Sequence, residues 1–128
     1  MLEHGALTER LIGLAIGVHE ILGPGVFESV YQECLCLELR EAGIAFESQV
    51  IMPVVYKGHT IPLVIPKGFR ADIVVADAVI IEVKAVAAFV PAHRAQLLTY
   101  LRLSKIRVGL LMNFHAPQLK DGLLRCVV

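Results

Sequence analysis

Cysteine is scarce in this chain, with three among 128 residues. Cys34, Cys36 and Cys126 are an odd number, and their spacing fits neither a zinc site nor a disulfide framework. On a helix, Cys34 and Cys36 would face different sides and would not share a partner. We therefore expect free, buried thiols in a reducing compartment, with a cytoplasmic location as the default.

Long uninterrupted apolar runs are also missing. The most apolar stretch, residues 73–88, is broken by Asp77, Glu82 and Lys84, whereas a helix that spans a bilayer needs about 20 apolar residues. Charged residues such as Glu9 interrupt the N-terminus where a signal peptide would have its apolar segment. We expect neither a membrane partner nor a secretion signal.

Repeats, low-complexity tracts and linkers are absent as well, so we expect one domain over residues 1–128. Apolar residues make up 56% of the chain, which is enough for a packed interior and too many for a disordered chain. The sequence contains no G-x-x-x-x-G-K phosphate loop. Its glycine-rich segment, Gly23-Pro24-Gly25, has the composition of a helix-breaking turn instead.

The formal net charge is zero, but the charges are unevenly distributed. Residues 1–64 contain eight acidic and three basic side chains, whereas residues 65–128 contain four acidic and nine basic ones. The second half therefore favours a polyanion such as DNA or RNA, although ordinary solvated charge explains it equally well. Without a basic total, one chain is expected to bind nucleic acid weakly. A homo-oligomer or a protein partner would add affinity.

Apolar periodicity predicts an alternation of helices and strands. Helices are expected over residues 7–22, 26–42 and 91–103. Strands are expected over residues 46–56, 59–65, 70–75, 79–84, 107–113 and 123–127, and Pro53 indicates an edge strand or a bulge. This order predicts an α/β (α+β) fold with a central mixed β-sheet flanked by helices. The helix over 91–103 makes a link long enough for its flanking strands to be parallel.

Three chemically active side chains are predicted to meet on neighbouring strands. Alternation along strand 79–84 places Glu82 and Lys84 on the same face, and a short turn brings Asp72 alongside. Two carboxylates suit Mg²⁺ or Mn²⁺, and a lysine can stabilise the charge that develops on a phosphate. The alternative is a buried ion pair between Glu82 and Lys84 or Asp72.

Polar residues on two helices add to this group. Gln96 and Tyr100 share a face of helix 91–103 and can bind phosphate or orient the acid–lysine pair. Alternatively, the glutamine lies on the surface and the tyrosine hydroxyl in water. Glu28 is expected on the core-facing side of helix 26–42, where an acid needs a partner or a metal. Its alternative role is interaction with the helix N-terminus.

Five motifs together resemble the GxxExxY protein family of the PD-(D/E)xK nuclease-like superfamily. In chain order they are Gly25–Tyr31 (G-x-x-E-x-x-Y), Phe69-Arg70-Ala71-Asp72, Glu82-Val83-Lys84, Gln96–Leu101 and Gly109–Phe114. The resemblance covers residues 7–127 and implies a restriction-endonuclease-like core of α-β-β-β-α-β type. It further implies that Asp72 and Glu82 bind the metal and that Lys84 is the catalytic lysine. Gln96 and Tyr100 match the Q-x-x-x-Y motif of RecB-like nucleases.

The same resemblance implies a third residue in the metal shell, for which Glu28 is the candidate and His19 the reserve. Ala71 departs from the superfamily pattern by replacing its proline, at a position that carries no chemistry. The expected function is a Mg²⁺-dependent nuclease that hydrolyses DNA or RNA phosphodiester bonds. The alternatives are a non-catalytic nucleic-acid- or protein-binding module on the same fold, and a metal-dependent phosphoesterase for small molecules.

Overall fold

The computed structural model describes residues 2–62 and 69–128. The helices in this part are α1 (Gly5–Leu22), α2 (Glu28–Glu41), α3 (Pro91–Ser104) and the 3₁₀ helix η2 (Leu119–Gly122). The strands are β1 (Phe46–Ile51), β2 (Val54–Tyr56), β3 (His59–Ile61), β4 (Arg70–Val75), β5 (Val79–Lys84), β6 (Val108–Asn113) and β7 (Leu123–Val127). Three predicted strand ranges, those of β4, β5 and β7, match these bounds.

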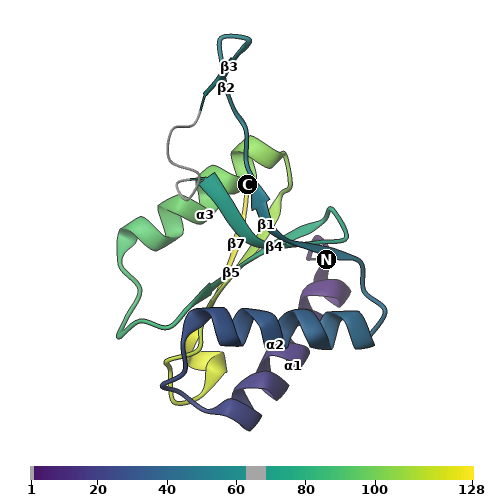
Figure 1. Ribbon diagram of the computed structural model, residues 1–128, viewed down its shortest axis with the longest axis vertical. Coiled ribbons are helices and arrows are strands. Elements are labelled where there is room, and N and C mark those ends of the chain that lie inside the picture. Colours follow the sequence, from purple (N-terminus) through teal and green to yellow (C-terminus); the bar gives the residue numbers. More distant parts are fainter. Residues whose placement is uncertain (1, 63–68) are drawn as a thin grey trace.

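The main sheet has five strands in the order β1-β4-β5-β6-β7 (Figure 1). Strands β5 and β6 are parallel, and the other neighbouring pairs are antiparallel. The sheet is therefore mixed, and α3 makes the crossover between its two parallel strands, both as predicted.

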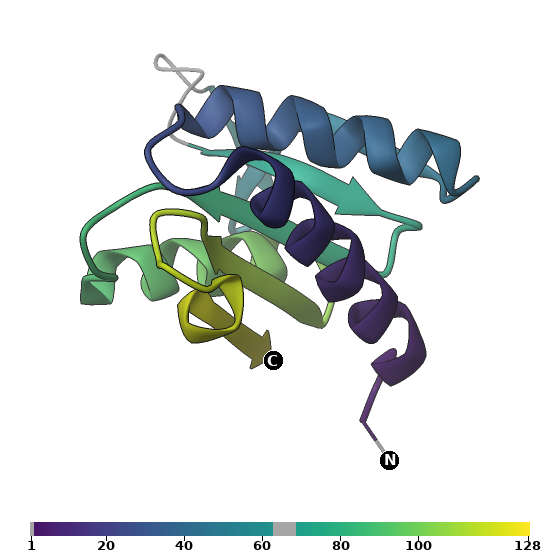
Figure 2. The same ribbon diagram turned by 90° about the horizontal axis from the view of Figure 1, so that it is seen from below.

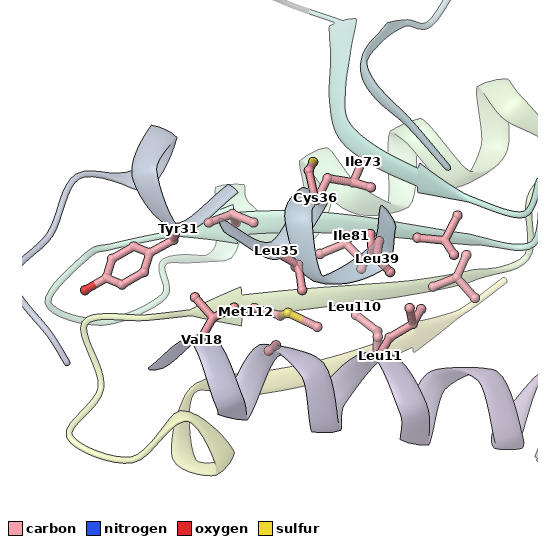
Figure 3. Close-up of a cluster of buried hydrophobic side chains, with 14 of the residues drawn as sticks. Leu11, Val18, Tyr31, Leu35, Cys36, Leu39, Ile73, Ile81, Leu110 and Met112 are labelled. Carbon is pink, nitrogen blue, oxygen red and sulfur yellow. The ribbon is translucent and has the colours of Figure 1, made fainter. Parts of the chain in front are cut away.

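Helices cover both faces of this sheet, with α1 and α2 on one side and α3 on the other (Figures 1 and 2). On the first side, Leu11 and Leu35 from the helices pack on Ile81 and Leu110 from the sheet (Figure 3). All six residues of β6 are buried, as expected for a central parallel strand that is covered twice.

The packing of α3 on β6 depends on a glycine. A Cβ atom added at Gly109 would lie 2.8 Å from Leu97 Cδ1, which is too close for an ordinary contact. Gly109 therefore lets α3 approach the sheet closely. This contact orients the helix face that carries Tyr100 toward the sheet.

The predicted strand 46–56 is wrong in one respect, because it breaks at Pro53 into β1 and β2. Proline has no N–H for a ladder and limits the residue before it. Strand β1 is an edge of the main sheet, as Pro53 indicated. The strands β2 and β3 form a separate hairpin that projects from the rest of the molecule (Figure 1). The remainder of the predicted strand 59–65 lies largely outside the described residues.

The tyrosine of the G-x-x-E-x-x-Y motif holds the turn between α1 and α2. Tyr31 is completely buried, and its ring stacks on Phe114 at 4.5 Å between centroids. Its hydroxyl donates to the Gly23 carbonyl and accepts from the Val26 N–H at 3.1 Å. Gly25 has a φ of 95°, which glycine adopts without strain. This turn fixes the position at which α2 begins.

The three cysteines are free; Cys36 and Cys126 are buried and Cys34 is partly buried. Burial raises the pKa of the Cys36 thiol to about 11, which makes it unreactive at neutral pH. Over the described ranges, none of the helices combines the length and the apolar character that crossing a membrane requires.

Candidate active site

Strands β4 and β5 stop pairing where the sheet reaches its acidic residues. Their ladder ends at the Ile73–Ile81 pair. Beyond it, the Asp72 N–H donates to Glu82 Oε1 at 2.9 Å, and the Val83 N–H donates to Asp72 Oδ2 at 2.8 Å. Side-chain oxygens thus replace backbone acceptors. The two carboxylates are thereby fixed at the point where the strands diverge.

These carboxylates line an open cavity of about 220 Å³. The residues around it are Gln49, Arg70, Asp72, Glu82, Lys84, Gln96 and Tyr100. The structure therefore brings together all five residues that the sequence assigned to catalysis. Arg70 and Gln49 also line the cavity, and the sequence had not assigned them to the site.

The two acids are held in an environment that opposes their negative charge. Burial, together with the charge of Asp72, raises the pKa of Glu82 from 4.5 to about 8. Burial also raises the pKa of Asp72, against the lowering effects of the Val83 N–H and of Lys84. A bound cation would favour the ionised form of both groups. The donor set, two carboxylates at an open cavity, fits the hard ions Mg²⁺ and Mn²⁺.

Lys84 does not form the buried ion pair that was the alternative reading of this group. Its side chain is half-buried, and in the part of the chain that the structure describes the single ion pair joins Arg107 and Glu3. Lys84 nevertheless lowers the pKa of both acids, so its charge acts on them at longer range. Its ammonium is left available for an anion in the cavity.

Tyr100 and Gln96 form a linked pair on α3. Tyr100 is buried, with 1% of its surface exposed, so it is not the solvated tyrosine of the alternative reading. Burial and the charge of Glu82 raise the pKa of its hydroxyl, while hydrogen bonds with the Arg70 backbone and the Gln96 side chain lower it. The hydroxyl therefore stays protonated at neutral pH and can act as a hydrogen-bond donor in the cavity.

Two further glutamines support Asp72. Gln49 Nε2 donates to Gln32 Oε1 at 3.0 Å and lies 3.5 Å from Asp72 Oδ1. Gln32, which is buried on α2, donates through its own Nε2 to the Asp72 carbonyl at 3.2 Å. The sequence signal for this arrangement is the run of polar residues 47–49, which breaks the alternation expected of a half-buried strand.

Glu28 approaches the site from outside the cavity. The expectation that it faces the core is wrong, because its side chain is exposed. Its Oε2 accepts from the Ala85 N–H at 2.8 Å, just past the end of β5. Its charge raises the pKa of Asp72, so the two acids interact at a distance. Among the described residues, no three His, Cys, Asp or Glu side chains are grouped closely enough to hold a metal ion.

His19, the reserve ligand, lies elsewhere. Its Nε2 donates to the Ala116 carbonyl at 2.9 Å, and its ring lies 6.2 Å from that of Phe114. It lines a separate cavity of about 560 Å³ between the end of α1 and η2. His19 therefore ties the end of α1 to the segment that precedes η2, through a carbonyl outside its own helix.

Comparison with known proteins is consistent with this geometry. The model of the PD-(D/E)XK nuclease superfamily matches residues 5–126. No curated protein and no solved structure matches the chain. The superfamily match spans nearly all of the sequence and includes both strands that carry the acids and the lysine. The chain belongs to the PD-(D/E)XK nuclease superfamily.

Proposed function

We propose that the protein is a Mg²⁺-dependent nuclease that hydrolyses phosphodiester bonds of DNA or RNA. The observation that carries the proposal is the convergence of Asp72, Glu82 and Lys84 on one open cavity, with Lys84 in no ion pair among the described residues. Membership of a nuclease superfamily supports the same reaction class.

In this proposal the five predicted site residues share three roles. Asp72 and Glu82 would hold Mg²⁺ or Mn²⁺, and the ion would supply Lewis-acid stabilisation of the charge on the phosphate. Lys84 donates to a non-bridging oxygen and stabilises the charge that develops there. Gln96 and Tyr100 orient the substrate phosphate through their amide and hydroxyl groups.

Two finer assignments belong to the same proposal. Membership of the GxxExxY family rests on the five motifs. The first of them has a physical role, because its tyrosine, Tyr31, holds the turn between α1 and α2. A metal-shell role for Glu28 rests on the superfamily resemblance and on the hydrogen bond that brings its carboxylate to the end of β5, the strand that carries Glu82. Because Glu28 bonds the Ala85 N–H, such a role would use its second oxygen or a bridging water.

The test is cleavage of single- and double-stranded DNA and RNA by the pure protein with Mg²⁺ or Mn²⁺. Lys84→Met keeps the apolar stem and removes the charge, so we expect turnover to fall by roughly 10²-fold or more. Lys120→Met, at an exposed position of η2, is the matched control and should cleave like the wild type. Cleavage that persists undiminished in Lys84→Met would indicate a contaminating nuclease and contradict the proposal.

One observation favours the non-catalytic alternative, namely that no third acid joins Asp72 and Glu82 within ligand distance in the described part of the chain. Calorimetric titration with Mn²⁺ separates the two functions. A nuclease should bind the ion and lose that binding in Asp72→Asn. Binding that is absent, or that does not depend on Asp72, favours a nucleic-acid- or protein-binding module on a nuclease fold.

A further inference from the structure

A second cation lines the cavity together with Lys84. Arg70 is the first residue of β4 and precedes Asp72 by two positions, so both side chains belong to the same face of the strand. The Arg70 side chain is half-buried, and its fully buried Nε atom has no hydrogen-bond partner among the residues that the structure describes. Throughout the described residues, no carboxylate is close enough to form an ion pair with it.

The backbone holds this arginine in place from two sides. Arg70 pairs with Ile51 at the end of β1. On the other side, the Tyr100 hydroxyl forms a hydrogen bond with the Arg70 backbone. The backbone of Arg70 is therefore fixed beside the cavity, so its side chain extends from a strand rather than from a loop.

A guanidinium that is partly removed from water and has no ion-pair partner lowers stability unless an anion binds to it. Arginine presents its N–H groups as a planar fork that matches two oxygens of one phosphate. With Lys84, it supplies a second positive charge to the cavity in which the proposed phosphodiester chemistry takes place.

We propose that Arg70 binds a backbone phosphate of the nucleic-acid strand that enters the cavity, through two parallel N–H···O hydrogen bonds. The identity of the ligand rests on the proposed nuclease function. The contact itself rests on the geometry and unpaired charge of Arg70.

The first experiment measures binding in EDTA, where no metal-dependent cleavage occurs. The probe is a short fluorescein-labelled single-stranded oligonucleotide, followed by anisotropy over a series of salt concentrations. Arg70→Met should weaken binding roughly 10-fold and lower the slope of log Kd against log salt by about one. Arg70→Lys should restore the slope but only part of the affinity, because lysine lacks the fork.

Arg10→Met is the matched control, because it removes the same charge from an exposed position on α1, across the sheet from the cavity. It should bind the oligonucleotide like the wild type. Arg70→Met should unfold at the same urea concentration as the wild type or a higher one, since it removes a buried nitrogen without a partner. A merely structural role for Arg70 predicts lower stability instead.

A thermodynamic cycle tests whether the ligand is a phosphate. Single methylphosphonate linkages, which lack the negative charge, are placed in turn along the oligonucleotide. At one linkage the modification should weaken wild-type binding about as much as Arg70→Met does, and should weaken the variant little further. Additive losses at every linkage would show that Arg70 contacts no particular phosphate.

The results for the two proposals are distinguishable. Binding that depends on Arg70 without any cleavage removes the nuclease proposal and leaves the phosphate contact standing. Cleavage by a protein whose oligonucleotide affinity does not depend on Arg70 overturns the contact alone. The contact is also overturned if the wild type shows no measurable binding.

Discussion

Among single residues, Gln49 shows most clearly how the site shapes the backbone. It has a φ of 53°, in the left-handed region, within an edge strand. The pairs Ser48–Ile73 and Val50–Ala71 flank it, and Gln49 itself has no ladder partner. For a residue with a side chain this conformation costs about 1–2 kcal/mol. Strained conformations often occur at functional sites, and here the conformation directs an amide toward Asp72.

Gln49→Gly should separate strain from function. Relief of about 1–2 kcal/mol offsets the lost hydrogen bond to Gln32, worth about 1 kcal/mol, so the free energy of unfolding should change by less than about 1 kcal/mol. Affinity for Mn²⁺ should fall roughly 10-fold, because Asp72 loses a group that orients it. Urea unfolding and calorimetric titration measure the two effects.

Lys57→Gly is the control for this substitution. Lys57 has a φ of 50° in the turn between β2 and β3, so glycine relieves the same kind of strain outside the cavity. Its affinity for Mn²⁺ should equal that of the wild type. If Gln49→Gly also binds Mn²⁺ like the wild type, Gln49 does not support the site.

At the scale of helices and strands, local periodicity in the sequence predicts where strands lie and which side chains share a face. Strands β4 and β5 were predicted with their observed bounds, and alternation along them was enough to place Asp72, Glu82 and Lys84 together. The parallel pairing of β5 with β6 followed from the length of the crossover. These features depend on side-chain period and chain length alone.

Contacts between distant segments were not predictable in the same way. Glu28 bonds Ala85, 57 positions along the chain, and no local pattern marks that distance. Gln32 and Gln49 come together on Asp72 only because α2, β1 and β4 are adjacent in the fold. The sequence therefore indicated five of the residues that line the cavity but missed most of those that hold them in place.

Tyr31→Phe tests the turn that positions α2. The substitution keeps the ring on Phe114 but leaves the Gly23 carbonyl and the Val26 N–H without the hydroxyl. Loss of buried partners should lower the free energy of unfolding by about 1–3 kcal/mol, measured by urea denaturation. Tyr56→Phe removes a hydroxyl from a tyrosine that is 61% exposed and should change stability by less than about 0.5 kcal/mol. Equal effects would exclude a special role for the turn.

For the molecule as a whole, the raised pKa values of Glu82 and Asp72 make the free energy of unfolding depend on pH. The pKa of Glu82 is about 8 in the folded protein, against 4.5 for an unperturbed glutamate. A raised pKa means that the unfolded chain releases this proton first as pH rises. The contribution of Glu82 to stability is therefore complete below pH 4.5 and is lost as pH rises toward 8. The raised pKa of Asp72 acts in the same direction.

Glu82→Gln should remove most of this pH dependence. Glutamine keeps an oxygen that can accept from the Asp72 N–H but has no proton to lose. In EDTA, the variant should therefore gain stability relative to the wild type as pH rises from 4.5 to 8. One pKa unit corresponds to about 1.4 kcal/mol, so the difference should reach a few kcal/mol. Parallel profiles for the two proteins would show that Glu82 ionises normally in the fold.

Mn²⁺ should oppose the loss of wild-type stability that occurs as the pH rises. A ligand that binds only the folded state at 100 times its Kd adds about 2.7 kcal/mol, and this gain requires ionised carboxylates. Urea unfolding should therefore show a large effect of Mn²⁺ near pH 8 and a small one near pH 6, where Glu82 holds its proton. Glu82→Gln should show little gain at either pH. Stabilisation by Mn²⁺ that is equal at both pH values, or is retained in the variant, would place the ion away from Glu82.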